Sequence, residues 1–351
     1  MNELGSKFDW GSNSAFLGGS GLRIDGACWY RSGRDALRAL VCGSEERPSR
    51  VLLPALCCES MILPFRQHGI DIAFYRMTPE LKGDMGDLLT KLCDGAMLIY
   101  MRYFGIRPFE DDFLAGLRER YKGLRLVEDR THDIIIPRRG EDLLPDAMLA
   151  SVRKWAALPE GALLVTGAET PAGESDRRFG DMQRAAMEMK SRFLQGSAED
   201  KPENYLELFR RSEELLDDNT EPRLISDEYM SLIDSMDFEG MLSRRKRNTA
   251  ALKELLAPLE KRDELKTLSP CPEEGCLYFP VLLDNRDAVQ RHMAQRRIYC
   301  PVIWPLPEQV RGLCPVTEHT AAHMLAIPCD QRYSEADMEL TVHCLAGALK
   351  H

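Results

Sequence analysis

The sequence has no hydrophobic run long enough to cross a membrane and no cysteine spacing typical of a metal or disulfide framework. No apolar stretch in the 351 residues approaches the about 20 residues that a membrane helix needs. The 11 cysteines include no CxxC pair, and several lie in apolar contexts, as expected of reduced thiols in a core. The opening residues MNELGSKFDWGSNS lack a basic segment followed by an apolar one, so we expect no secretory signal. These absences predict a cytoplasmic protein.

The sequence also lacks an excess of positive charge and several common catalytic motifs. Lys and Arg number 46 against 56 Asp and Glu, a net charge of −10, which does not favour a nucleic-acid surface. No GxSxG turn is present, and no GK[ST] follows the glycine-rich residues 18–21. His319 and His323 are four residues apart but lack the glutamate of an HExxH motif, so we expect no metal site.

Short apolar runs alternate with amphipathic stretches between residues 32 and 166. Ser32 is a plausible N-cap for a helix that follows it, whereas residues 1–30 are predicted to be irregular. The predicted strands are 51–53, 72–75, 96–100, 124–127, 147–151 and 162–166, and the predicted helices between them are 60–67, 86–92 and 110–121. This alternation predicts a largely parallel α/β sheet with crossover helices on both faces.

The pattern changes after about residue 175. Residues 176–219 are charged and favour helix, and a second long helix is predicted from 236 to 259. Beyond it the predicted strands are 276–283 and 298–303, and the predicted helices are 287–296 and 334–349. We therefore expect a large α/β domain over residues 1–240, mainly helical from 176, and a smaller α+β domain over residues 241–351.

Polar side chains follow two of the predicted strands. Asp129 ends one apolar run, with His132 three residues later, and another run ends in Ser151 shortly before Lys154. Ligands bind at the carboxyl ends of the strands in open α/β sheets. A lysine and a carboxylate there suit pyridoxal phosphate, because the lysine forms a Schiff base and the acid keeps the pyridine nitrogen protonated. Singly, each residue has an ordinary interpretation as a surface lysine, a helix-capping acid or a packing histidine.

A second feature is the segment Ser32-Gly33-Arg34, which opens the first predicted helix. Backbone N–H groups at a helix N-terminus can hold a phosphate dianion, and Ser32 would add a hydroxyl. The alternative is an ordinary N-cap.

Six segments follow one another along the chain, namely YRSGRDALRAL (30–40), residues 50–77, MLIYMRYFG (97–105), VEDRTHD (127–133), ASVRKW (150–155) and AIPCDQRYSEADME (326–339). In this order they resemble the DegT/DnrJ/EryC1 (sugar aminotransferase-like) family of fold-type I pyridoxal-phosphate proteins. The resemblance implies a three-layer α/β/α large domain with a mixed, mostly parallel seven-stranded sheet, and a smaller C-terminal domain. It also implies a homodimer with the active site at the interface.

The resemblance further implies the cofactor, the reaction and the residues that serve them. The implied activity is that of a pyridoxal 5'-phosphate-dependent aminotransferase, which moves an amino group from an amino-acid donor to a keto or aldehyde acceptor, sugar-like in the family. Lys154 would form the Schiff base and move the proton, and Asp129 would pair with the pyridine nitrogen. The other implied cofactor contacts are His132 at the ring hydroxyl and Ser32, Gly33, Arg34 and Ser151 at the phosphate. Candidates for holding the substrate are Arg153, Arg130, Tyr103 and Arg332.

The sequence departs from the family pattern at several positions. Cys58, or alternatively Cys57, occupies the place of an aromatic residue that stacks on the cofactor ring, and Arg34 replaces a threonine. Residues 159–162, PEGA, replace a glycine pair, and the nearest counterpart of the asparagine through which the partner subunit completes the site is Asn248. These changes leave an alternative open, namely a catalytically degenerate protein that uses this fold for binding or as a scaffold.

Overall fold

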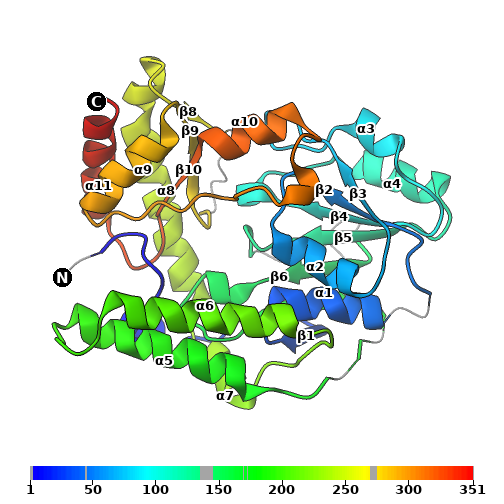
Figure 1. Cartoon of the computed structure of the whole chain (residues 1–351), viewed down its shortest axis with the longest axis horizontal. Helices are drawn as coiled ribbons and strands as arrows, with labels where there is room; N and C mark the ends of the chain where they lie inside the picture. Colours follow the sequence, from blue (N-terminus) through cyan, green and yellow to red (C-terminus); the bar gives the residue numbers. More distant parts are fainter. Residues whose placement is uncertain are drawn as a thin grey trace.

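The computed structural model describes residues 3–43, 46–134, 145–168, 170–171, 173–268 and 275–350. Its centre is a seven-stranded sheet with the order β1-β7-β6-β5-β4-β2-β3 (Figure 1). The strands are β1 (Ala27–Tyr30), β2 (Val51–Pro54), β3 (Ile72–Tyr75), β4 (Met97–Met101), β5 (Arg125–Asp129), β6 (Ala147–Ala150) and β7 (Ala162–Thr166). Strands β2 to β6 pair in parallel, and β7 runs antiparallel to both β6 and β1. The predicted α/β class with a mixed, mostly parallel sheet is confirmed.

The central strands are buried on both faces, which explains their nearly continuous apolar sequences. All residues of β2, β4 and β6 are buried, as expected of parallel strands covered by helices. The six predicted strands of this region are confirmed, but the prediction that residues 1–30 are irregular is wrong. Strand β1 lies at the sheet edge and is only partly buried, and a 3-10 helix, η1 (Trp10–Phe16), precedes it. Because glycines and serines surround it, the composition of the sequence does not indicate such a short edge strand.

Helices pack against this sheet and enlarge this part of the molecule on one side. Ser32 caps α1, since its side chain accepts a hydrogen bond from the Asp35 backbone N–H, as predicted. The helices of this part are α1 (Gly33–Cys42), α2 (Glu59–Gln67), α3 (Met85–Leu89), α4 (Asp111–Arg120), α5 (Arg177–Leu194), α6 (Pro202–Asp218) and α7 (Asp227–Asp234). The charged stretch 176–219 forms two helices, α5 and α6, which lie side by side along the lower edge of Figure 1.

The C-terminal part packs helices around a three-stranded sheet with the order β10-β9-β8. Its elements are α8 (Phe238–Lys261), β8 (Lys266–Thr267), β9 (Phe279–Leu282), α9 (Arg286–Gln295), η4 (Glu308–Val310), α10 (Pro315–His323), β10 (Met324–Ile327) and α11 (Glu335–Ala348). No helix in the described part of the chain combines the length and apolarity needed to cross a membrane.

One strand predicted for this part is wrong. Residues 298–303 are apolar and partly buried, but only Ile298 makes a bridge, to Leu4 of the N-terminal segment. Pro301 has no N–H to donate to a ladder. The sheet instead takes Met324–Ile327 as its edge, antiparallel to β9. Residues 298–303 are therefore free to form an irregular segment, which leads into Trp304.

The loop before β7 is fastened to two helices by a buried glutamate. Glu160 is 1% exposed and accepts a hydrogen bond of 2.8 Å from the backbone N–H of Ser226, which caps α7. On the α5 side, a Cβ added to Gly180 would lie 2.5 Å from the Glu160 carboxyl. Burial raises the pKa of Glu160 from its ordinary 4.5 to about 7.

This raised pKa predicts a pH-dependent stability. Because the folded chain holds the proton of Glu160 more tightly than the unfolded chain does, its contribution is full below pH 4.5 and is lost as the pH rises through about 7. Glu160→Gln imitates the protonated form. We expect the wild type to lose free energy of unfolding relative to this variant between about pH 5 and about pH 8, measured by urea titration.

Glu254→Gln, which changes an exposed residue of α8, is the matched control. Its free energy of unfolding should follow that of the wild type across the same pH range. A constant difference between wild type and Glu160→Gln across this range would contradict the prediction.

Candidate active site

The pairing of β5 with β6 brings the key polar residues to one edge of the sheet. Asp129, the last residue of β5, lies opposite Leu149 of β6, two residues before Ser151. Thr131 joins the two strand ends, because its hydroxyl accepts from the Ser151 N–H at 3.2 Å. Its carbonyl accepts from the indole N–H of Trp155 at 2.9 Å. The turn that carries Lys154 is thereby fastened to the turn that follows Asp129.

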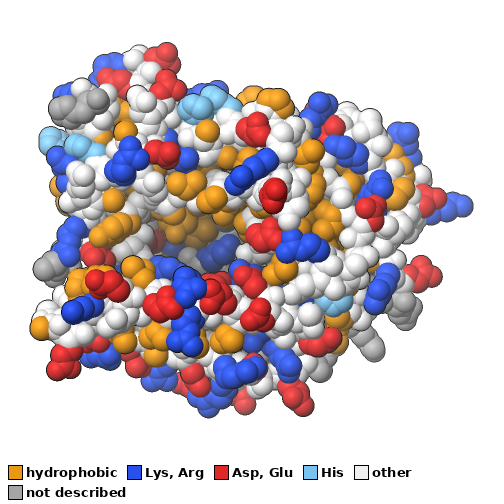
Figure 2. All heavy atoms as spheres, in the orientation of Figure 1, with side chains coloured by type: hydrophobic (Ala, Val, Ile, Leu, Met, Phe, Trp, Pro, Cys, Tyr) orange, Lys and Arg blue, Asp and Glu red, His pale blue; other side chains and the backbone are white. Residues whose placement is uncertain are grey.

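Two adjoining cavities open at this edge. The inner cavity, about 290 Å³, contains six of the seven sequence-predicted cofactor residues: Ser32, Gly33, Arg34, Asp129, Ser151 and Lys154. The seventh, His132, lines the outer cavity of about 380 Å³. Lys154, Arg153 and Trp304 line both. Figure 2 shows this face of the molecule hollowed between α6 and the segment that precedes α10, with hydrophobic and basic side chains in the hollow.

Asp129 is a carboxylate enclosed by protein. It is 5% exposed and accepts a hydrogen bond of 2.8 Å from the backbone N–H of Thr131. Burial raises its pKa, although the Thr131 hydrogen bonds and the Lys154 charge oppose the rise. A bound cation or a protonated ring nitrogen would stabilise the charged form of such a buried carboxylate.

Lys154 presents its amine to both cavities. Within the described residues no hydrogen bond or ion pair holds this amine, whereas its backbone is well fixed. The Lys154 N–H donates to the Ser151 carbonyl at 3.2 Å, and the neighbouring Arg153 N–H donates to the Gly161 carbonyl at 2.9 Å. Gly161, with φ of 139°, therefore closes the turn despite the altered glycine pair. The side chain is available for covalent chemistry.

His132 is buried among aromatic rings. Its ring centroid lies 4.8 Å from that of Phe104 and 5.3 Å from that of Trp304. Burial, and secondarily the Lys154 charge, lower its pKa well below the ordinary value, so the imidazole is neutral at pH 7. Its Nδ1 has no hydrogen-bond partner among the described residues. A buried polar atom left in this state suits a ligand hydroxyl or phenolate.

The start of α1 and the end of β6 form a narrow cup in the inner cavity. A Cβ added to Gly33 would lie 3.7 Å from the Ser151 Cβ, so the two residues face each other closely. The Ser32 hydroxyl lies at the same helix start, where it accepts from the Asp35 N–H at 3.3 Å and donates to the Asp35 carboxylate at 2.6 Å. Backbone N–H groups at a helix start and two nearby hydroxyls are a suitable environment for a phosphate.

A carboxylate from α6 compensates the cations beside this cup. Glu213 contacts Arg34 at 2.9 Å and Arg153 at 2.8 Å, and Arg34 also reaches Asp217 at 3.0 Å. Although burial opposes it, the charges of Arg153 and Arg34 hold the pKa of Glu213 at about 2. Arg34 thus lines the cavity as predicted, but its guanidinium is already paired.

The predicted substrate residues are divided between the cavity and the protein interior. Arg153 and Arg332 line the outer cavity. Arg130 is buried and pairs with Glu128 at 3.4 Å and Asp133 at 3.2 Å, and the Tyr103 hydroxyl donates to the Leu56 carbonyl.

Asn248, the nearest counterpart of the family's interface asparagine, is buried. Its amide donates to the carbonyls of Cys329, Asp330 and Tyr333 at 3.3, 3.0 and 3.0 Å. In this chain it holds the turn over residues 329–333.

Sequence reasoning missed three residues of the site, namely Lys7, Glu213 and Trp304. Cys58 does line the inner cavity, as the family comparison predicts, but Trp304 lines it too and supplies an aromatic ring. None of the three lies in a motif, and only tertiary packing brings them here. In the described ranges no group of three or more His, Cys, Asp or Glu residues is arranged to hold a metal ion.

No protein-family model matches the chain, and no curated protein matches it by sequence. Solved structures do match its fold. A DegT DnrJ EryC1 StrS aminotransferase from Brucella abortus superposes with a TM-score of 0.60 at 14% identity, covering 92% of this chain and 86% of its own. Helicobacter pylori PseC, an aminotransferase involved in the biosynthesis of pseudoaminic acid, gives 0.67 at 13% identity, with coverage of 100% and 93%. NtdA from Bacillus subtilis, with bound cofactor pmp, gives 0.64 at 14%, with coverage of 93% and 73%. At these identities the likeness shows that the chain shares the fold of these three proteins.

The Glu213 cluster generates a stability prediction. Glu213→Gln leaves the Arg34 and Arg153 guanidinium groups facing each other without their shared carboxylate. We expect a loss of about 1–3 kcal/mol in the free energy of unfolding, less than for a fully buried pair because Glu213 is 29% exposed.

Glu207→Gln is the matched control, because it removes an exposed partner of Arg210 from the same helix and should change stability little. Equal stability of the two variants, measured by urea unfolding, would show that the cluster does not stabilise the fold.

Proposed function

We propose that this chain is a pyridoxal 5'-phosphate-dependent aminotransferase, which moves an amino group from an amino-acid donor to a keto or aldehyde acceptor. The observation that carries the proposal is one cavity holding a buried carboxylate, Asp129, a free amine, Lys154, and the start of α1. The fold neighbours support it, since two are named aminotransferases and a third was solved with bound cofactor pmp.

The residues present fit this cofactor. Ser32, Gly33 and Ser151 form the cup for its phosphate, with Arg34 beside them. Asp129 would hold the pyridine nitrogen protonated, which also offsets the cost of burying its carboxylate. The neutral His132, with its Nδ1 lacking a partner, suits the ring hydroxyl. Bound there, pyridoxal phosphate supplies an electron sink for charge that develops on the substrate carbon.

Lys154 has two tasks in this proposal. Its amine would hold the cofactor through the cofactor's aldehyde, and when free it would take up and return the proton of the substrate carbon. Both tasks need an amine that no other group engages, which is its state among the described residues. Fixed backbone contacts to Ser151 and Gly161 keep the side chain at the junction of the two cavities.

Trp304 bears on the alternative of a degenerate scaffold. The main reason for that alternative is Cys58, which stands where the family has a stacking aromatic residue. Trp304 lines the same cavity as Cys58 and Asp129, so an aromatic ring is available from another part of the chain. The presence of the Trp304 ring therefore favours an active enzyme over a degenerate scaffold.

The proposal includes the arrangement of the protein as a whole. We expect a large cofactor-binding domain over residues 1–240 and a smaller domain over 241–351. We also expect a cytoplasmic homodimer with the active site at its interface. A small amino donor and a carbonyl acceptor, sugar-like according to the family resemblance, are the expected ligands.

The first test is a visible absorbance spectrum of the purified protein with pyridoxal phosphate. We expect a yellow absorbance in the wild type and in Lys253→Ala, which changes an exposed lysine of α8, but not in Lys154→Ala. Addition of glutamate should bleach the wild-type absorbance. A yellow protein that responds to no amino donor would contradict aminotransferase activity, and no yellow species would support the scaffold.

Asp129→Asn separates cofactor binding from stability. Because burial raises the pKa of Asp129, its charged form costs folding free energy at neutral pH. We expect the variant without cofactor to melt at a higher temperature than the wild type, while its affinity for pyridoxal phosphate falls about tenfold or more, ~1.4 kcal/mol. A variant that binds the cofactor as tightly as the wild type would remove Asp129 from the site.

A further inference from the structure

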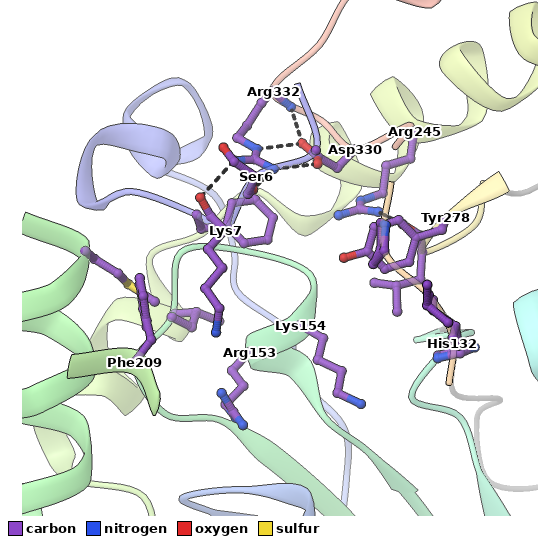
Figure 3. A pocket seen from close by; sticks show the side chains of 18 of the residues that line it. Ser6, Lys7, His132, Arg153, Lys154, Phe209, Arg245, Tyr278, Asp330 and Arg332 are labelled. Carbon is purple, nitrogen blue, oxygen red and sulfur yellow. Dashed lines mark hydrogen bonds and ion pairs between the residues drawn. The ribbon is translucent and has the colours of Figure 1, made fainter. Parts of the chain in front are cut away.

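Five basic residues line the outer cavity, namely Lys7, Arg153, Lys154, Arg245 and Arg332. Figure 3 shows Lys7 extending from the N-terminal segment toward the turn after β6, which carries Arg153 and Lys154. Apolar side chains such as Phe8, Met187 and Leu277 line the same cavity. The cavity therefore has apolar walls and several basic side chains, with Asp330 as an acidic one.

Most cations around this cavity already have partners. Arg332 pairs with Asp330 at 2.8 Å, and Arg153 pairs with Glu213 at 2.8 Å. The buried Arg245 donates to the carbonyls of Cys276, Leu277 and Trp155, each at 3.1 Å. Lys154 is reserved for the cofactor in the proposed function. Lys7 is therefore the lining cation that remains for the substrate.

The ammonium of Lys7 lies where a ligand can reach it. It sits 4.5 Å from the centroid of the Phe209 ring, and no hydrogen bond or ion pair holds it within the described residues. The side chain is exposed, but the surface it exposes faces the cavity, where protein surrounds the charge. Burial lowers the pKa of Lys7, while Glu213 opposes this effect and Arg153 reinforces it. An anion placed here would relieve that unfavourable setting.

The backbone under Lys7 is held from two sides. The buried Lys190 of α5 donates to the Ser6 hydroxyl at 2.7 Å and also to the Lys7 carbonyl. Arg332 donates to the Ser6 carbonyl at 2.8 Å and to the Lys7 carbonyl at 3.4 Å. A lysine on an unattached segment would sample many positions, whereas Lys7 extends from a segment that is fixed against α5 and the turn near residue 330. Such fixation is typical of a binding residue.

From this arrangement we infer that Lys7 determines substrate specificity by binding a carboxylate remote from the reacting carbon. The inference rests on the proposed function and specifies its substrate: a short acid whose carbon chain lies along the apolar walls, with one end at Lys154 and a carboxylate at Lys7. A substrate with an amide in place of that carboxylate leaves the Lys7 charge uncompensated and binds more weakly.

The first experiment measures binding without any reaction. Isothermal titration calorimetry compares glutarate with its uncharged diamide on the wild type, Lys7→Met and Lys253→Met. We expect the wild type and Lys253→Met to prefer glutarate, and Lys7→Met to bind glutarate about tenfold more weakly with unchanged affinity for the diamide. A Lys7→Met protein that keeps the preference, or a wild type that shows none, would overturn the inference. Lys7→Arg should restore the preference, whereas a merely structural role would not distinguish the two ligands.

The second experiment separates this inference from the proposed function. The yellow protein is mixed with glutamate or glutamine, and the loss of absorbance is followed over time. In Lys7→Met the half-saturating glutamate concentration should rise about tenfold, with the limiting rate and the glutamine response unchanged. An absent yellow species combined with Lys7-dependent glutarate binding would reject the aminotransferase and retain the anion site. If the wild type and Lys7→Met are both yellow and respond equally to glutamate, the aminotransferase is retained and the anion site at Lys7 is rejected.

Discussion

The parallel pairing of β5 with β6 is the constraint on which the rest of the site depends. Because Asp129 lies opposite Leu149, the chain delivers a carboxylate and, a few residues beyond the neighbouring strand, a lysine to the same sheet edge. Thr131 then fixes the spacing through hydrogen bonds to Ser151 and Trp155. A shift of this register by one residue would turn the Asp129 side chain to the opposite face of the sheet.

Electrostatic balance around this edge comes from elements far apart in the chain. The cluster of Arg34, Arg153 and Glu213 joins α1, the turn after β6 and α6. Its carboxylate lets two guanidinium groups lie beside a cavity, where each alone would be costly. The long helices α5 and α6, which look like an appendage in Figure 1, are therefore part of the site.

The sequence predicted the central sheet and the ends of its strands because both depend on local patterns. Asp129 ends an apolar run, Lys154 follows another by a few residues, and Ser32 precedes an amphipathic stretch. Their positions along the chain were therefore enough to place them at strand ends and at a helix start. Glu213 and Lys7 could not be found this way, since Glu213 meets Arg153 across 60 residues and Lys7 lies in an irregular segment. The apolar residues of 298–303 predicted a strand wrongly, because apolar character does not distinguish a paired strand from a buried irregular segment.

The hydrogen bond between Ser6 and Arg332 joins residues 326 positions apart. Closing a loop of this length has an entropic cost, which the packing of the rest of the chain offsets. The position of Lys7 in the outer cavity therefore depends on the two ends of the chain meeting.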